Sequence, residues 1–306
     1  MKKDMSLNRR RVFVEKFFHG LFLLAALIAV LSVALIIIFI FGKGLAPFFS
    51  GNEYGTYSFI DFIRGLKWTP QSGEYGIGYM IVNSIFATFG AILLGVPIAL
   101  LTAVFIAEIA PKRIAGMVRP AIELLAAIPS VLYGVFGFAV ITPLVKQISP
   151  YPTGDSLIAV IIVLTIMILP TIVAVVETAI RAVPKSYKEG SLALGASKIQ
   201  TIFKVTLPAA RSGILTGIIL GVGRAIGETM AVILVAGNPE SGIATTIFDR
   251  VRLLTTNIAL EQGYAAKLHE QMLFSTAVVL FIFIMIINLV LARIQKKGGD
   301  CLCLEK

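Results

Sequence analysis

The chain has 306 residues, of which 57% are hydrophobic and only 14% are charged. Because soluble domains carry about 25% charged residues, this composition excludes an ordinary soluble enzyme and predicts a membrane protein. The net charge of +10 would suit binding to nucleic acid, but the basic residues follow the membrane segments, as described below, so we expect no nucleic-acid partner.

Six apolar segments are each long enough to cross about 30 Å of hydrocarbon as a helix. They comprise residues 17–41, 79–107, 119–141, 157–181, 209–236 and 272–294. The first is too long for the apolar core of a signal peptide and lacks a small-residue cleavage site. The loops between segments are too short to form soluble domains. We therefore predict one all-α membrane domain, residues 17–294, flanked by tails at 1–16 and 295–306.

Lys and Arg are concentrated on one side of these segments. There are six in residues 1–16, three in 108–120, six in 181–211 and four after residue 292. The loops on the opposite side together contain seven, in residues 42–78, 142–156 and 237–271. Since basic residues favour the cytoplasmic face, we expect both termini in the cytoplasm and these loops outside it. The basic side would also attract anionic membrane lipid.

Three glutamates lie near the cytoplasmic ends of predicted segments, each four positions from a basic residue. The pairs are Glu108 with Lys112, Glu123 with Arg119, and Glu177 with Arg181. Ion pairs with this spacing stabilise a helix and are tolerated near lipid headgroups. We expect all three pairs to be structural.

Residues 186–208, SYKEGSLALGASKIQTIFKVTLP, form a polar loop in which we predict two short helices. Pro184 suits the first turn of one helix. Gly195 suits its end, because glycine adopts a positive φ without steric cost. Ser197 and Gln200 have the spacing of a capping box that opens the second helix.

One face of the first predicted helix carries Tyr187, Ser191 and Leu194, at i, i+4 and i+7. A helical unit that projects from the basic side of a membrane protein is typical of a docking site for a cytosolic partner. The alternative is an ordinary interfacial helix that lies on lipid headgroups. The spacing alone leaves both interpretations open.

The fifth segment contains two charged residues near its centre, Arg224 and Glu228. Thirteen residues separate Arg224 from Arg211 at the cytoplasmic edge, about 20 Å along a helix. Inserting a charge at that depth costs at least ~2.5 kcal/mol, so both residues are candidates for function. The i, i+4 spacing also allows them to pair, and a self-neutralising structural couple is the alternative.

Glycines surround the charged residues at spacings that suit close helix packing. Gly213, Gly217 and Gly221 recur every four residues, and Gly223 and Gly227 form a second such pair. Small residues let helices approach closely. They also leave backbone N–H groups accessible, so an anion pathway beside the arginine would explain them as well.

Two prolines lie inside predicted segments, Pro129 in AAIPSVLYGVFGF and Pro170 in MILPT. Each removes one helix hydrogen-bond donor. Broken helices near the bilayer midplane often frame transport sites, but a packing kink explains each proline equally well.

The polar loop resembles the cytoplasmic EAA loop of ABC importer permeases. The matching residues are Glu189, Gly190, Ser191, Gly195, Leu207 and Pro208, with Gly190 and Ser191 in place of two alanines. Three further segments are similar to bacterial phosphate-uptake ABC permeases: VFIAEIAPKR (104–113), AAIPSVLYGVFGF (126–138) and GRAIGETMAVILVAGN (223–238). The last is closer to the C-type (PstC-type) subunit than to the A-type subunit, and the match extends from about residue 80 to residue 290.

The resemblance implies a type I ABC importer permease with six transmembrane helices in the bacterial inner membrane. It implies phosphate translocation by Arg224, Glu228 and Thr229. It implies ATPase coupling by Glu189, Gly190, Ser191, Gly195 and Pro208. The implied partners are an A-type second permease subunit, a cytosolic ATPase dimer, an extracytoplasmic phosphate-binding protein and inorganic phosphate. The chain has no phosphate-binding G-x-x-x-x-G-K-[ST] loop, so we expect a transport subunit that does not hydrolyse ATP by itself. We assign it no catalytic residues, cofactor or metal.

Several alternatives remain. A permease for sulfate or molybdate belongs to the same class. A stand-alone channel or secondary transporter is disfavoured by the elaborate polar loop. A membrane-embedded enzyme is disfavoured because no catalytic set gathers at one depth. Cys301 and Cys303 lie in the predicted cytoplasmic tail, where we expect neither a disulfide nor a metal site, and we assign no role to His19 or His269.

Overall fold

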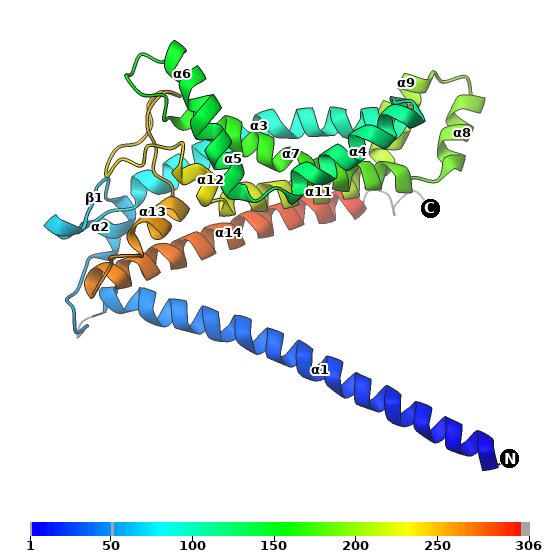
Figure 1. Ribbon diagram of the computed structural model, residues 1–306, viewed down its shortest axis with the longest axis horizontal. Helices are drawn as coiled ribbons and strands as arrows, with labels where there is room; N and C mark the ends of the chain where they lie inside the picture. Colours follow the sequence, from blue (N-terminus) through cyan, green and yellow to red (C-terminus); the bar gives the residue numbers. More distant parts are fainter. Residues whose placement is uncertain (1, 50–51, 301–306) are drawn as a thin grey trace.

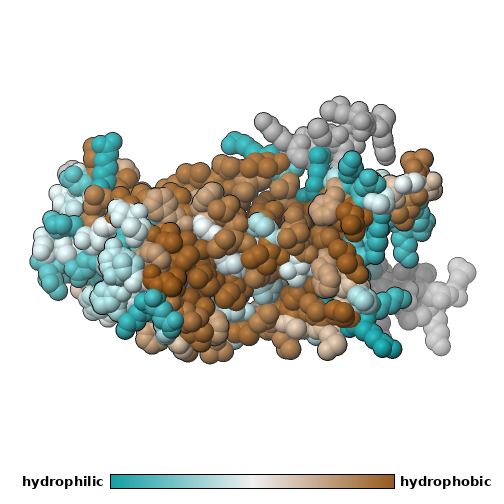
Figure 2. Space-filling view, turned by 90° about the horizontal axis from the view of Figure 1, so that it is seen from above, coloured by the Kyte–Doolittle hydropathy of each residue, from teal (hydrophilic) through white to brown (hydrophobic). Residues whose placement is uncertain are grey.

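The computed structural model describes residues 2–49 and 52–300, with side chains at 15–49 and 52–295. Long helices run side by side in one bundle, from which helix α1 diverges (Figure 1). Among the described residues, five helices are long and apolar enough to cross a membrane, and a bent helix pair makes a sixth. An apolar belt separates two polar ends of the molecule (Figure 2). Cys301 and Cys303 lie outside the described residues.

Four of the six predicted segments form continuous helices. They are α1 (Lys2–Leu45), α3 (Gly78–Val104), α7 (Leu157–Ala182) and α14 (Leu268–Asp300). A 3-10 turn, η1 (Ala46–Phe48), follows α1, and a π-helical turn, η3 (Phe105–Ile109), continues α3. α7 remains helical through Pro170, so this proline does not break the segment.

The predicted segment 119–141 is interrupted at Pro129. α4 (Lys112–Ala127) ends before it, and α5 (Ser130–Phe136), η4 (Gly137–Ile141) and α6 (Thr142–Ile148) follow it. Proline disfavours the helical conformation of the residue before it, and Ile128 accordingly has an extended ψ of 128°. The membrane-length helix therefore runs from Ser130 to Ile148.

The predicted segment 209–236 is also interrupted. α9 (Lys198–Thr201), η5 (Ile202–Thr206) and α10 (Leu207–Ala209) lead into α11 (Arg211–Gly227), with a 70° bend before α11. α11 ends at Gly227, and α12 (Met230–Ile233) begins after two non-helical residues. The segment is therefore a helix with a break at each end, rather than one straight span.

The core of the bundle lies between α3, α7 and α11. Glycines on α11 make this packing close. A Cβ at Gly217 would lie 2.9 Å from Val176 Cγ2, and one at Gly221 would lie 2.6 Å from Ile172 Cδ1. The glycine row from residue 213 to residue 221 therefore serves contact with α7.

α1 meets the bundle mainly through its C-terminal end. Phe39 packs edge-on against Phe274 of α14, and Ser275 Oγ donates to the carbonyl oxygen of Gly44 at 2.6 Å. The apolar stretch of α1 is otherwise exposed, and Figure 1 shows the helix leaving the bundle.

The two polar ends of the bundle differ in structure. One end, which we call the basic end, carries the α3–α4 junction and α8 (Lys185–Ala193). The opposite end carries α2 (Phe59–Arg64), η2 (Pro70–Ser72), α13 (Leu254–Glu261) and an antiparallel hairpin of β1 (Trp68–Thr69) and β2 (Glu74–Tyr75), in which Trp68 pairs with Tyr75. A small aromatic core fixes the opposite end. It contains Phe62, Trp68, Tyr75, Tyr79, Leu254 and Met272.

Candidate functional site

Arg224 lies half-buried in the last turn of α11, against α7. Its Nη1 donates a hydrogen bond to Thr171 Oγ1 at 2.7 Å. Among the described side chains this is the one hydrogen bond of the guanidinium group, so most of its five N–H donors remain available to an anion. Thr171 was not predicted as a site residue. Its position directly after Pro170 in an apolar segment could have indicated one, because a polar side chain there is unusual.

The ion pair that the i, i+4 spacing of Arg224 and Glu228 allows does not form among the described side chains. α11 ends at Gly227 and Glu228 has an extended ψ of 130°, so the i, i+4 relation of a helix is lost. Glu228 Oε1 instead accepts the Ala231 N–H at 3.0 Å. A carboxylate that accepts a free N–H at a helix start stabilises that start. Glu228 therefore holds the break between α11 and α12.

The break is also held by hydroxyl groups. Thr229 Oγ1 donates to the Gly227 carbonyl oxygen at 3.3 Å. Thr255 Oγ1, from α13, donates to the Glu228 carbonyl oxygen at 3.0 Å. Beside the break, a Cβ at Gly223 or Gly227 would meet no atom within 4 Å, so this face of α11 is uncovered. The second glycine pair thus differs from the packed row closer to the basic end.

The two interrupted helices meet near Arg224. α5, which follows Pro129, packs against α12 so closely that a Cβ at Gly134 would lie 2.7 Å from Ala231 Cα. Tyr133 Oη donates to the Leu125 carbonyl oxygen at 2.6 Å, and the same oxygen accepts the Ile128 N–H at the end of α4, so Tyr133 ties α5 to the last turn of α4. Discontinuous helices of this kind commonly frame substrate sites in transporters.

The polar loop forms the two short helices that the sequence predicts. Gly195 has a φ of +84°, and Ser197 and Gln200 form the capping box, with hydrogen bonds of 2.9 and 3.2 Å. Ser191 Oγ lies 3.0 Å from Thr201 Oγ1 and joins α8 to α9. The loop is therefore a defined unit of short helices joined by a turn, which we call the coupling segment (residues 185–206) after the ATPase contact that its resemblance to the EAA loop implies.

The coupling segment projects from the basic end of the bundle (Figure 1). Its surface carries large apolar side chains: Leu194 is 90% exposed, Ile199 69%, and Tyr187 and Phe203 54% each. Glu189 is exposed on the same unit. Ser191 faces the second helix, whereas Tyr187 and Leu194 remain available for contact with another molecule.

One of the three predicted ion pairs is present. Glu177 Oε1 accepts from Arg181 Nε at 2.8 Å, and the same oxygen accepts from Arg119 Nη2 of α4 at 2.5 Å. Arg119 therefore pairs across helices rather than with Glu123 on its own helix. Glu108 likewise pairs across elements, with Lys188 of α8 instead of Lys112.

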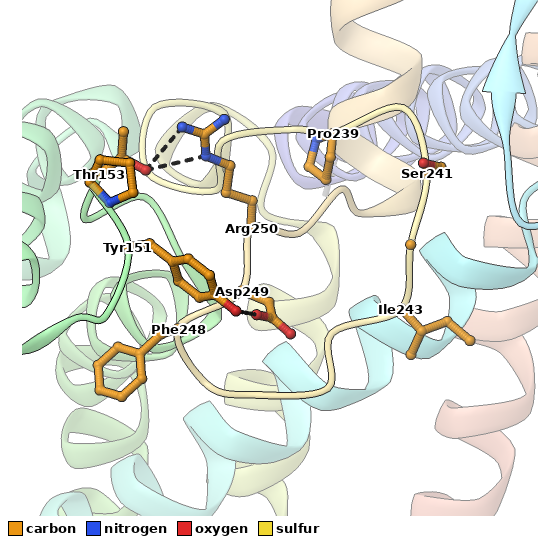
Figure 3. A pocket seen from close by; sticks show the side chains of 10 residues that line it. Tyr151, Thr153, Pro239, Ser241, Ile243, Phe248, Asp249 and Arg250 are labelled. Atoms are coloured by element: carbon orange, nitrogen blue, oxygen red, sulfur yellow. Dashed lines mark hydrogen bonds between the residues drawn. The ribbon is translucent and has the colours of Figure 1, made fainter.

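The opposite end contains a cavity of about 480 Å³ between the loops that precede α7 and follow α12 (Figure 3). Tyr151 Oη donates to Asp249 Oδ1 at 2.8 Å, and the N–H groups of Thr245 and Thr246 donate to Asp249 Oδ2. Burial raises the pKa of Asp249, but these hydrogen bonds outweigh it and hold the pKa well below its usual range. Arg250 contacts Thr153 Oγ1 at 3.0 Å and carries the exposed positive charge of this cavity.

A second charged cluster at this end is more deeply buried. Arg252 and Glu261, 3% and 8% exposed, form an ion pair, and His269 Nε2 lies 3.2 Å from Glu261 Oε2. This cluster ties the loop after α12 to α13 and α14. Among the described residues, no group of three or more His, Cys, Asp and Glu side chains is arranged to hold a metal ion.

This chain is similar in sequence and in fold to permease proteins of ABC transporters. Residues 95–297 match the family described as binding-protein-dependent transport system inner membrane component. The probable ABC transporter permease protein YqgH of Bacillus subtilis is 39% identical over 88% of this chain and 88% of its own. The phosphate transport system permease protein PstC of Pasteurella multocida is 34% identical over 82% of this chain and 85% of its own. A solved bacterial ABC transporter involved in alginate import has the same fold, with a TM-score of 0.61 and 18% identity over 89% of this chain and 95% of the matched chain.

Proposed function

This chain belongs to the family of binding-protein-dependent transport system inner membrane components, and we propose that its substrate is inorganic phosphate. It is a permease subunit of an ABC importer and a multi-pass protein of the inner membrane. The resemblance predicted from residues 104–113, 126–138 and 223–238 is thereby confirmed at the level of the family.

Arg224 is the observation that carries the phosphate assignment. It offers N–H donors without a partner among the described side chains, beside the end of α11, and a guanidinium group binds oxyanions in a bidentate manner. The PstC relative, whose name specifies phosphate transport, supports phosphate over sulfate or molybdate as the anion. A second PstC relative, from Xylella fastidiosa, is 30% identical over 88% of this chain.

We assign the residues at the break separate roles. Arg224 supplies the positive charge that compensates a partly dehydrated phosphate, and Thr171 orients it. Glu228 holds the start of α12 and thereby the shape of the site, instead of neutralising Arg224. Thr229 offers a hydroxyl group at the same break. The uncovered face at Gly223 and Gly227 lets either the anion or a second permease subunit approach.

The coupling segment is the proposed contact with a cytosolic ATPase dimer. Its exposed apolar side chains, Tyr187 and Leu194, suit a protein groove. Gly195 provides the turn that presents them, and Ser191 joins the two short helices. Pro208 begins the turn into α11, so a pull on this segment would reach the helix that carries Arg224. Glu189 and Gly190 are the remaining members of this contact.

The positive-inside pattern supports an orientation with the basic end and both termini in the cytoplasm. The opposite end then faces an extracytoplasmic phosphate-binding protein. The cavity beside Arg250 lies on that surface and offers a cation with aromatic neighbours, Tyr151 and Phe248, a composition common at protein interfaces. ATP hydrolysis would belong to the separate ATPase subunit.

Reconstitution of the whole complex tests the substrate. Vesicles that contain both permease subunits, the ATPase dimer and the binding protein should take up labelled phosphate only with internal ATP. Sulfate and molybdate should neither be taken up nor compete. ATP-driven uptake of sulfate without phosphate would replace the substrate assignment, and uptake without ATP would favour a channel or secondary transporter.

A further inference from the structure

Lys188 of the coupling segment forms an ion pair with Glu108 of η3, eighty residues earlier in the chain. The side chains are 24% and 11% exposed, so the pair is largely shielded from water. A shielded pair interacts more strongly than a surface salt bridge, because the local dielectric constant is lower. Among the described side chains, it is the one ion pair that joins α8 to the membrane-spanning helices.

Glu108 lies at the point where α3 turns into α4. In η3 the helical hydrogen bond widens, and the Ala110 N–H donates to the Phe105 carbonyl oxygen at 2.7 Å. Pro111 then ends the helix, and α4 begins at Lys112. π-helical turns are rare and frequently occur at functional sites. A displacement of Glu108 would therefore move the α3–α4 junction.

The same junction is also held by α7. Arg181 Nη2 donates to the Ile106 carbonyl oxygen at 3.1 Å, and Arg181 Nε binds Glu177, which also binds Arg119 of α4. The coupling segment, η3, α7 and α4 are thus connected by charged side chains at the basic end. α4 continues to the break at Pro129, after which α5 packs against α12 beside the Glu228 break.

We propose that the Lys188–Glu108 pair is the latch through which movement of the coupling segment displaces the α3–α4 junction and, through α4, the break near Arg224. Lys188 and Glu108 are positioning residues in this role, since neither touches the substrate. The inference rests on the proposed ATP-driven function. Without the pair, α8 would move with the ATPase while the junction remained in place, so ATP would be hydrolysed with little transport.

The competing explanation is that the pair only anchors α8 to the bundle. An anchor affects assembly, whereas a latch affects the amount of phosphate moved per ATP hydrolysed. The experiment uses the reconstituted complex with four variants: Lys188→Glu, Glu108→Lys, the double exchange, and Arg293→Glu. Arg293 is exposed on α14, outside the coupling segment and the α3–α4 junction, so Arg293→Glu is the control for a reversed charge that does not touch the pair.

We expect each single reversal to lower the phosphate-to-ATP ratio roughly tenfold while ATP hydrolysis continues, an effect within the range of coupling between contacting residues. The double exchange should restore the ratio to within about threefold, and Arg293→Glu should leave it unchanged. An unchanged ratio in the single reversals, or a double exchange as poor as they are, would overturn the proposal.

A neutral variant of the Lys188–Glu108 pair separates loss of the latch from loss of assembly. If a reversed charge prevents assembly, the neutral pair Lys188→Met with Glu108→Gln removes the link without leaving a buried charge unpaired. The latch predicts a low phosphate-to-ATP ratio for this variant, and a wild-type ratio would refute it.

A cysteine at Gly223, with Cys301 and Cys303 changed to serine, reports whether ATP changes the thiol reactivity of this site. This signal needs no phosphate, so it tests the latch even if the transported anion proves to be different. Loss of the ATP-dependent change in thiol reactivity in Lys188→Glu supports the latch. A retained change contradicts the latch.

Discussion

Two regions of this molecule carry side chains that their surroundings disfavour, and they do so in opposite ways. Arg224 places a charge in a predominantly apolar helix, half-buried against α7. Leu194 places an apolar side chain, 90% exposed, on the polar coupling segment. A charge at membrane depth costs at least ~2.5 kcal/mol, and leaving a leucine in water forgoes about 1.5–3 kcal/mol of burial. Each region is therefore suited to a partner that relieves the cost: an anion in the first, a protein surface in the second.

The two regions also differ in what holds them in shape. The coupling segment is defined by its own local contacts, namely the capping box at Ser197 and the positive φ of Gly195. The Arg224 region is assembled from distant parts of the chain, because Thr171 comes from α7 and Thr255 from α13. A local change should therefore disable the first region, whereas the second can be weakened one contact at a time. The predictions below test this difference.

The largest expected effect is that of Gly195→Val. Gly195 has a φ of +84°, which a β-branched residue adopts only with strain of roughly 1–3 kcal/mol. The variant should reach the membrane but lose ATP-driven uptake and co-purify poorly with the ATPase. Gly195→Asn is the matched control, since asparagine tolerates a positive φ, and it should retain most transport. Normal uptake by Gly195→Val would remove the turn from the coupling mechanism.

Arg224→Gln should assemble normally and lower phosphate uptake roughly 10- to 100-fold. Hydrogen bonds to charged groups contribute about 1.5–3 kcal/mol, and the glutamine keeps none of the charge. Arg224→Lys should recover only part of the activity, because an ammonium group lacks the bidentate fork. Uptake is measured in reconstituted vesicles, with assembly checked by co-purification. Full uptake by Arg224→Leu with Glu228→Leu would show instead that the arginine is structural.

Leu194→Ser should weaken the binding of the ATPase to the permease about tenfold or more. A leucine that becomes buried contributes roughly 1.5–3 kcal/mol, which serine cannot supply. Titration of the solubilised permease with ATPase measures the change. Ile148→Ser is the control, because Ile148 is 70% exposed at the opposite end of the bundle. Unchanged ATPase affinity together with reduced binding to lipid vesicles would favour the interfacial-helix interpretation of α8.

The same contrast explains how far the sequence could predict the structure. The cap and turn of the coupling segment depend on residues within a few positions of one another, and both predictions are confirmed. The apolar lengths predicted six spans, of which four are continuous helices and two are interrupted. Pro129 was a visible candidate for a break because proline lacks the N–H donor. The break at Glu228 carries no such mark, because a glycine such as Gly227 only weakens a helix, by about 1 kcal/mol relative to alanine, and the other glycines of α11 remain helical.

What the sequence could not predict are contacts between distant elements. The Arg224–Glu228 spacing fits an ion pair only if the helix continues, and the hydrogen bonds to Ala231 and Thr255 favour the interruption. Glu108 had a suitable partner at Lys112, yet it pairs with Lys188 on α8. Spacing rules consider one helix at a time, so they cannot weigh a competitor that the fold brings from another helix.

Glu228→Ala should have a smaller effect than loss of the arginine. It removes the acceptor for the Ala231 N–H, and loss of such a cap costs about 1 kcal/mol, or roughly fivefold in a two-state equilibrium. Glu228→Gln keeps an acceptor oxygen and should transport nearly as well as the wild type. The measurements are uptake and thermal stability of the assembled complex. A Glu228→Gln variant as inactive as Arg224→Gln would mean that the carboxylate charge itself acts in translocation.

The smallest effect is expected from Thr171→Val, which removes only the hydroxyl group that receives the Arg224 hydrogen bond. Uptake should fall roughly two- to fivefold, because Arg224 keeps its charge in this variant and the loss should lie in the lower part of the about 0.5–1.5 kcal/mol that a typical hydrogen bond contributes. Thr171→Ser keeps the hydroxyl and should behave as the wild type. If Thr171 acts only by orienting Arg224, then Thr171→Val should cause no further loss in the Arg224→Gln variant, since the two effects would not add. An equal additional loss in that background would show that Thr171 acts on the anion or on α7 independently, and the arginine would then need another explanation for its fixed position against α7.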